Sequence, residues 1–224
     1  MKDLGLRYDF HMHTIFSDGS LLPAAIVREA EVKGCSTIAL TDHVDPSNME
    51  IVIKAINKFL HEMEEHLPIR VFSGVEISYV KPEIILEYCK KARHLGAKVI
   101  VVHGESPVEN VYPGTNHAAV SQKGVVDILA HPGNITEEDV KLAAQNEVFL
   151  ELSARAGHKN GNQHVAKLAK KFGAKLLVNT DAHSEKDLIT QQDAFRIAKD
   201  AGLSEKDALV AVKENPQELI RRLI

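Results

Sequence analysis

The sequence has no tryptophan, only two cysteines and few aromatic residues, which make up 5% of its 224 positions. Cys35 and Cys89 form no CxxC pair, so we expect neither a disulfide framework nor a thiolate zinc site. Both are expected to pack as small hydrophobic side chains. Few rings are available to stack on bases, and the formal net charge is −4. These features disfavour nucleic acid as the main partner.

Long apolar runs are also missing. No segment approaches the ~20 apolar residues that a helix needs to span a bilayer, and residues 1–9 lack the apolar core of a signal peptide. We therefore expect a cytoplasmic protein with no membrane partner. Hydrophobic residues make up 44% of the chain, which is enough for one sizeable core. No linker rich in Pro, Gly or Ser interrupts residues 1–224, so they are expected to form a single domain, whose oligomeric state is left open.

Short runs rich in Val, Ile and Leu alternate with amphipathic stretches, as expected for buried strands and covering helices. The predicted strands are 8–13, 36–41, 69–76, 98–103, 125–130, 148–152 and 175–179. The predicted helices are 22–33, 49–66, 82–95, 136–145, 162–172, 188–201, 204–213 and 216–223. Gly34, Gly96 and Gly173 each follow a predicted helix, where a left-handed terminal residue is typical. The longest irregular stretch, 104–116, is a candidate substrate loop.

Polar residues follow nearly every predicted strand, and their distribution indicates the architecture. In an open doubly wound sheet, the site forms at one switch point and uses fewer strands. In a closed barrel, residues from many strand ends meet at one mouth. The sequence therefore predicts an α/β fold, a seven-stranded barrel with its site at the carboxyl ends of the strands.

The chain has 12 histidines, and many of them stand at these strand ends. In the phrase DFHMHTIFSDGS, alternation places His11 and His13 on one face of an extended chain and Met12 on the other. One such histidine is ordinarily a hydrogen-bonded structural residue, but burying so many ionisable groups together is costly unless cations compensate. We therefore predict metal binding by nine residues: His11, His13, Asp18, His43, Glu76, His103, His131, Asp181 and His183.

The ligand types indicate which metals the site would take. Histidine and carboxylate ligands without thiolates favour Zn, Mn or Fe and argue against a closed structural zinc site. Nine candidates exceed what one ion uses, so two or three divalent ions are expected, with a carboxylate such as Glu76 as a bridge. Closely spaced ions lower the pKa of a bridging water, which yields a hydroxide nucleophile, and they hold phosphoryl oxygens as charge develops. No P-loop or dinucleotide fingerprint is present, so no nucleotide cofactor is expected.

Taken together, the phrases HMHTIFSDGS, LTDH, GVE, VVHGE, AHPG and NTDAH, in this order over residues 11–183, resemble the polymerase and histidinol phosphatase (PHP) superfamily. The resemblance implies a distorted (β/α)7 barrel with a trinuclear metal site. Carried over by position, it implies one ion bound by His11, His13, Glu76 and Asp181, a second bound by Glu76, His103 and His131, and a third bound by Asp18, His43 and His183. Some members have histidine in place of Asp18, so the third site here has an oxygen ligand where they have a nitrogen ligand, which makes it a site for a harder cation.

The same resemblance bears on catalysis. It implies that Arg155, after the sixth strand, grips the substrate phosphate through its bidentate fork, with an arginine at the surface or behind the metal ligands as the alternative. Glu76 and Asp181 are predicted to act in catalysis through the ions they hold. Further candidate substrate contacts, for which solvated loop residues are the alternative, are Ser153, Glu105, His117 and His158.

The predicted function is hydrolysis of a small phosphomonoester, with histidinol phosphate, and hence histidine biosynthesis, the first candidate. A phosphodiesterase or exonuclease is the enzymatic alternative, because polymerase-associated members of the superfamily share the site, and protein-tyrosine phosphatase activity also stays open. A different class of function is a non-catalytic interaction subunit, as in the archaeal ribonuclease P protein that resembles this fold. That alternative predicts missing ligands, whereas all nine positions here hold competent residues.

Overall fold

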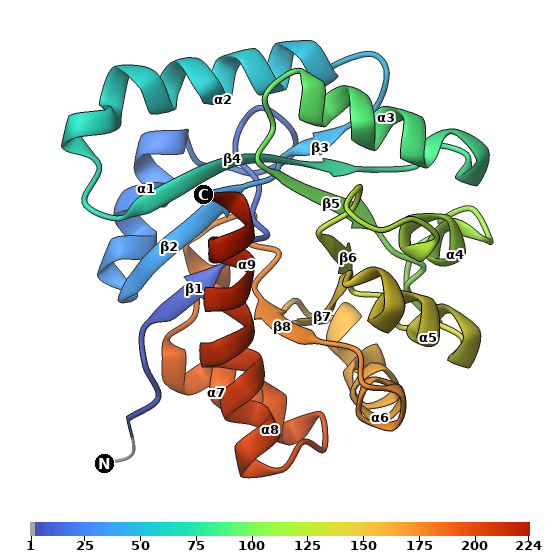
Figure 1. Ribbon diagram of the computed structural model, residues 1–224. Helices are drawn as coiled ribbons and strands as arrows, with labels where there is room; N and C mark the ends of the chain where they lie inside the picture. Colours follow the sequence, from blue (N-terminus) through green and yellow to red (C-terminus); the bar gives the residue numbers. More distant parts are fainter. Residues whose placement is uncertain (1–2) are drawn as a thin grey trace.

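Parallel strands pair side by side in the computed structural model, which describes residues 3–224. Seven of them follow one another in the order β1-β2-β4-β5-β6-β7-β8, and the short strand β3 pairs with β4. Their bounds are β1 (Arg7–Asp9), β2 (Cys35–Leu40), β3 (His43–Val44), β4 (Arg70–Ile77), β5 (Val99–His103), β6 (Ile128–Ala130), β7 (Phe149–Ser153) and β8 (Leu176–Asn179). The strands form a nearly closed barrel with helices around it (Figure 1), so the predicted distorted (β/α)7 barrel is confirmed.

The helices connect successive strands and cover the outside of the barrel (Figure 1). They are α1 (Pro23–Val32), α2 (Met49–Met63), α3 (Pro82–His94), α4 (Thr115–Val120), α5 (Glu137–Asn146), α6 (Asn162–Phe172), α7 (Gln191–Asp200), α8 (Glu205–Leu209) and α9 (Asn215–Leu223). The predicted helix-terminal glycines Gly34, Gly96 and Gly173 have φ angles of 83°, 104° and 78°, which confirms their left-handed conformation. Within residues 3–224, no helix has the length and apolar character to span a membrane.

Two hydrophobic layers follow from strand alternation. On β5, Val99 and Val101 pack inside the barrel, whereas Ile100 and Val102 pack outward against the helices. Leu219 and other residues of α9 join the inner layer, and α9 lies over the barrel beside β1 and β8 (Figure 1). The helix closes the amino end of the barrel, so the polar site can open only at the carboxyl end.

The seam between β8 and β1 is where the barrel is distorted. Here side chains replace most of the backbone ladder: Arg7 Nη1 donates to the carbonyl of Val178 at 2.9 Å, and the Thr180 hydroxyl donates to Asp9 at 2.7 Å. The backbone pairs again further along, where His13 N donates to the carbonyl of Ala182 at 2.8 Å. The predicted strand 8–13 is correspondingly shortened to Arg7–Asp9.

The structure also contains elements that the sequence patterns did not predict. The irregular stretch 104–116 ends in helix α4, which begins at Thr115 after Gly114 in the left-handed region. Six residues are too few to show a hydrophobic period, and α4 packs against α3 and α5. The predicted helix 204–213 is α-helical over Glu205–Leu209 and then continues into a π-helical segment, Val210–Glu214, just before Pro216. Proline has no N–H to donate, which disturbs the regular hydrogen-bond pattern at this point.

Candidate metal centre

Strand alternation carries ionisable side chains into the carboxyl end of the barrel. On β5, His103 lies on the same face as Val99 and Val101, which pack inside. On β4, Phe72 packs inside, so Glu76 four residues later also points inward. The apolar interior thus runs directly into a buried polar one. Six of the nine predicted ligands are at most 3% exposed: His11, His13, Glu76, His103, His131 and Asp181.

Two of these residues have strained backbones. His131 has a φ of 30° and Asp181 a φ of 53°, in the left-handed region that non-glycine residues rarely adopt. Such conformations cost on the order of 1–3 kcal/mol each and cluster at functional sites. The strain lies at two residues whose side chains point into the centre.

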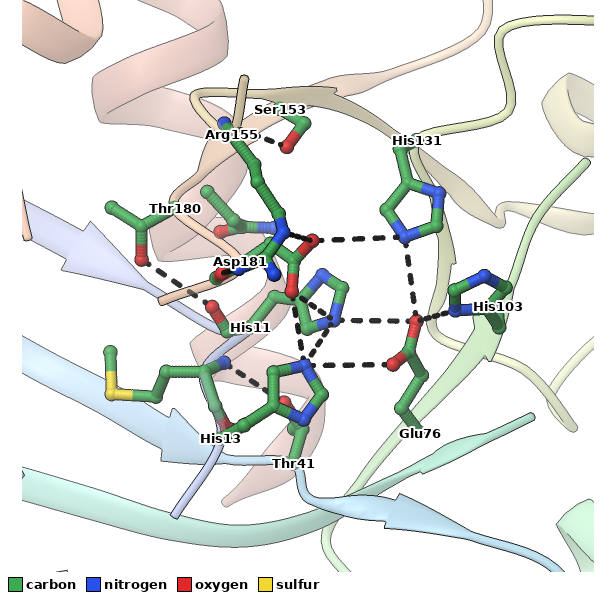
Figure 2. A network of polar contacts seen from close by, with 12 residues as sticks. His11, His13, Thr41, Glu76, His103, His131, Ser153, Arg155, Thr180 and Asp181 are labelled. Atoms are coloured by element: carbon green, nitrogen blue, oxygen red, sulfur yellow. Dashed lines mark hydrogen bonds and ion pairs between the residues drawn. The ribbon is translucent and has the colours of Figure 1, made fainter. Parts of the chain in front are cut away.

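Glu76 lies in the middle of the cluster and divides its two oxygens between imidazoles (Figure 2). Oε1 faces three rings, at 3.3 Å from His11 Nε2, 3.1 Å from His103 Nδ1 and 3.7 Å from His131 Nε2. Oε2 faces two others, at 2.7 Å from His43 Nδ1 and 3.6 Å from His13 Nε2. A carboxylate with a different set of neighbours on each oxygen has the geometry of a bridge.

Asp181 is divided in the same way (Figure 2). Its Oδ1 lies 3.1 Å from His13 Nε2, 3.6 Å from His183 Nδ1 and 3.7 Å from His11 Nε2. Its Oδ2 lies 3.6 Å from Arg155 Nε, 3.8 Å from His158 Nε2 and 4.0 Å from His131 Nε2. Asp181 therefore faces two groups of ligands, although the resemblance assigns it to one ion.

The third predicted group lies toward solvent. Asp18 Oδ2 lies 3.1 Å from His183 Nε2, and Asp18 Oδ1 lies 3.8 Å from His43 Nε2 and 4.0 Å from His13 Nδ1. The Asp18 side chain is 57% exposed, against 23% for His43 and 14% for His183. The group is assembled, but water competes for its ligands more than for the buried ones.

Electrostatics reflect this arrangement. Burial lowers the pKa of His13 to about 4 and, together with nearby His103, the pKa of His131 well below its usual value. Burial acts the same way on His103, but Glu76 and Glu109 outweigh it and raise its pKa to about 10. Burial opposes ionisation of Glu76, but His11, His43 and His103 outweigh it and hold its pKa well below the usual range. At neutral pH these shifts favour neutral imidazoles at His13 and His131, and a charged imidazole at His103 beside the charged carboxylate of Glu76.

Two buried carboxylates support the ligands from behind. Glu151 Oε2, on β7, lies 2.8 Å from His11 Nδ1, which leaves His11 Nε2 facing Glu76 and Asp181. A carboxylate on the far nitrogen is the usual way in which proteins fix a metal-binding imidazole. Asp42 accepts hydrogen bonds from Thr14 N at 2.7 Å and the Ser17 hydroxyl at 2.9 Å, and so holds the loop that carries Asp18.

Arg155 lies over the centre. Its Nη1 donates to the carbonyl oxygen of Asp181 at 3.1 Å and lies 2.6 Å from His183 Nδ1, and the side chain is 34% exposed. Ser153 is buried, and its hydroxyl accepts a hydrogen bond from Arg155 N at 3.2 Å (Figure 2). Ser153 therefore holds the backbone of Arg155, and Arg155 itself presents a cation at the mouth of the site.

The other predicted substrate contacts separate into two groups. Glu105 Oε1 accepts from the backbone N–H of Gly114 and Asn116, and His117 Nδ1 lies 2.7 Å from Asp139 on α5. In the described part of the chain, neither Glu105 nor His117 has a hydrogen bond or ion pair with the nine ligands, and their role in substrate binding stays a prediction. His158, in contrast, lies inside the cluster.

Sequence reasoning missed Glu151 and Glu109. Glu151 had a local signal, since it occupies an inward position between the apolar residues Leu150 and Leu152 of strand Phe149–Ser153. Glu109 had none beyond its place in the long loop after β5. Its Oε2 lies 2.6 Å from His103 Nε2, a contact that only the folded loop creates.

The donor set fits divalent cations. Both ring nitrogens of His131 are buried without a hydrogen-bond partner, although a neutral imidazole always carries one N–H. Several N–O separations in the cluster are 3.6–4.0 Å, too long for hydrogen bonds. Atoms that each lie ~2.0–2.2 Å from one ion are separated by roughly these distances. A bound ion would satisfy one ring nitrogen of His131 and separate the opposing charges of the cluster.

Comparisons with known proteins agree with this geometry. The sequence model of the PHP domain matches residues 9–185. An uncharacterized protein of Methanocaldococcus jannaschii is 42% identical over 97% of this chain and 100% of its own length. Ribonuclease P protein component 3 of Methanosarcina barkeri is 30% identical over 96% of this chain and 89% of its own length. A protein of Thermoanaerobacter sp. (strain X514) named "Probable phosphatase" is 29% identical over 89% of this chain and 88% of its own length.

Among solved structures, a chain in archaeal ribonuclease P with mature tRNA superposes with a TM-score of 0.70. The alignment covers 96% of this chain and 89% of that one, at 18% sequence identity. At that identity, the likeness concerns the fold alone.

Proposed function

The chain belongs to the PHP domain family, and we propose that it is a metal-dependent phosphatase acting on a small phosphomonoester. The observation that carries the proposal is the buried centre in which Glu76 and Asp181 each divide their oxygens among imidazoles, with Arg155 at its mouth. A relative of similar length is named as a phosphatase, which supports the same reaction class.

The roles of the residues follow from their positions. Two or three Zn, Mn or Fe ions held by the nine ligands would supply a nucleophile near neutral pH and neutralise the phosphoryl oxygens. Glu76 sets the spacing of the two groups of imidazoles that it faces. Arg155 offers parallel N–H donors to a phosphate, and its backbone is held by Ser153. Because six of the nine ligands are at most 3% exposed, their charges act in a medium that screens them less than water does.

A substrate screen tests the proposal. The Mn, Zn and Fe forms would be assayed in parallel with phosphomonoesters, beginning with histidinol phosphate, and with phosphodiesters. We expect metal-dependent release of inorganic phosphate from at least one monoester and loss of that activity with chelator. Protein that carries two or more ions but hydrolyses no monoester overturns the proposal. Faster turnover of diesters would instead assign the site to a phosphodiesterase or exonuclease.

One observation favours a second candidate, a component that assembles with RNA. A relative that is 30% identical over most of the chain is named as a protein component of ribonuclease P. The competent residues at all nine predicted ligand positions and the net charge of −4 favour the enzyme. Gel-shift titration with a structured RNA at low and at physiological salt separates the two candidates, because phosphate binding by basic side chains would appear as retardation that weakens as the salt concentration rises.

A further inference from the structure

His158 belongs to the metal centre by geometry, although the family resemblance assigns it no ion. The residue is 4% exposed, and its ring stacks on that of His131 with centroids 4.0 Å apart and planes 18° apart. Its Nε2 lies 3.8 Å from Asp181 Oδ2 and 3.6 Å from Glu109 Oε1. Its Nδ1 is buried without a hydrogen-bond partner.

The packing of two loops holds His158 in this place. A Cβ built on Gly161 would lie 2.5 Å from the Cα of Gly133, so only glycines allow this approach. Gly133 follows His131 by two residues, and Gly161 ends the 3-10 helix His158–Gly161. The contact therefore presses the turn after β6 against the turn after β7 and brings the two imidazoles together.

A structural histidine buried this deeply would be expected to hydrogen-bond through its ring nitrogens. His158 instead has ion-pair separations of 3.6 Å and 3.8 Å on one nitrogen and no partner on the other. The ligand atoms of His131, His158 and Asp181 all lie within 4.8 Å of one another, so the three residues form a group that could hold one ion. We propose that His158 is a tenth ligand of the centre and shares an ion with His131 and the Oδ2 oxygen of Asp181.

This inference rests on the metal centre of the proposed function and adds a consequence for the substrate. Arg155 Nε lies 3.6 Å from the same Oδ2 oxygen. A phosphate gripped by Arg155 would therefore lie beside the ion that His158 helps to hold. Glu109 is a positioning residue in this arrangement, because one of its oxygens faces His103 at 2.6 Å and the other faces His158 at 3.6 Å.

The test measures metal binding and needs no substrate. Wild type, His158→Ala, His158→Gln and Glu109→Gln would be titrated with Co²⁺ against a competing chelator, recording metal equivalents and the visible spectrum. His164→Ala is the matched control, because His164 is an exposed histidine of α6 whose Nε2 lies 2.7 Å from the carbonyl oxygen of Ile135. His158→Gln nearly preserves volume and polarity, so it keeps the test available if His158→Ala does not fold.

Loss of a partner outside the coordination sphere lowers metal affinity about 10–100-fold. We therefore expect both His158 variants to weaken one equivalent by more than about 100-fold and to change the Co²⁺ spectrum, and Glu109→Gln to stay within the 10–100-fold range. A decrease at His158 of 100-fold or less, or an unchanged spectrum, overturns the inference. Full metal loading of wild type without phosphatase activity would overturn the proposed function alone, so the two failures are distinguishable.

Discussion

Glu151→Gln tests one interaction behind the metal centre, the contact between the Glu151 carboxylate and His11. Glu151 Oε2 lies 2.8 Å from His11 Nδ1 and accepts a hydrogen bond from Asn179 Nδ2 at 3.1 Å, and both His11 and Glu151 are fully buried. With the proton of His11 on Nδ1, its Nε2 is free to face Glu76 and Asp181. Glutamine preserves the shape but removes the charge that holds this tautomer.

The magnitude follows from the contacts. A hydrogen bond to a charged group contributes ~1.5–3 kcal/mol and a neutral one ~0.5–1.5 kcal/mol, so His11 loses about 1–1.5 kcal/mol of support. The new amide nitrogen would occupy the place of Oε1, a buried atom without a partner, and an unpaired donor there costs ~1–3 kcal/mol of folding free energy. Because His11 is a proposed ligand, affinity for its ion should fall about 10–100-fold, or ~1.4–2.7 kcal/mol.

Chelator competition measures the affinity, and thermal melting of the metal-free protein measures the folding cost. The control is Glu147→Gln, since Glu147 is an exposed glutamate shortly before Glu151 in the sequence and its carboxylate pairs with Lys123 at 3.0 Å. If Glu151→Gln binds every ion as tightly as Glu147→Gln does, the support from behind His11 is refuted.

Three further predictions concern the same centre. Glu76→Gln should weaken the binding of at least two ions and abolish most activity, whereas His183→Ala should chiefly weaken the binding of the more exposed ion. If metal titration shows that both variants lose the same single ion, Glu76 is not a bridge between ions. Arg155→Ala should leave metal content and Tm unchanged and lower kcat/KM roughly 10- to 150-fold, so unaltered phosphatase kinetics would contradict its role. Against burial, Glu76 and Glu109 raise the pKa of His103 to about 10 from an ordinary value of 6.5. Its stabilisation of the metal-free protein is therefore complete below pH 6.5 and lost as pH rises through 10, and melting curves should show a decline that His103→Gln reduces.

Local patterns in the sequence determined the barrel and the place of most candidate ligands at its strand ends. Apolar runs of strand length, separated by helical patterns of which three end in glycine, placed the seven barrel strands, because the strand and helix periodicities are set by neighbouring residues. Two-residue alternation likewise predicted that His11 and His13 point together, and Met12 does pack in the outer layer. Such patterns need no knowledge of what lies across the barrel.

The tertiary structure decided what depends on loops and on the far side of the barrel. No local pattern shows that Arg7 and Asp9 close the seam with β8, or that Glu109 folds back onto His103. The sequence predicted His158 only as a candidate substrate contact, and it enters the centre because Gly133 and Gly161 let two turns touch. Contacts between distant segments depend on side-chain volume and loop path, which no periodicity encodes. For that reason, the sequence could predict which candidate ligands stand at strand ends but not which of their atoms face one another.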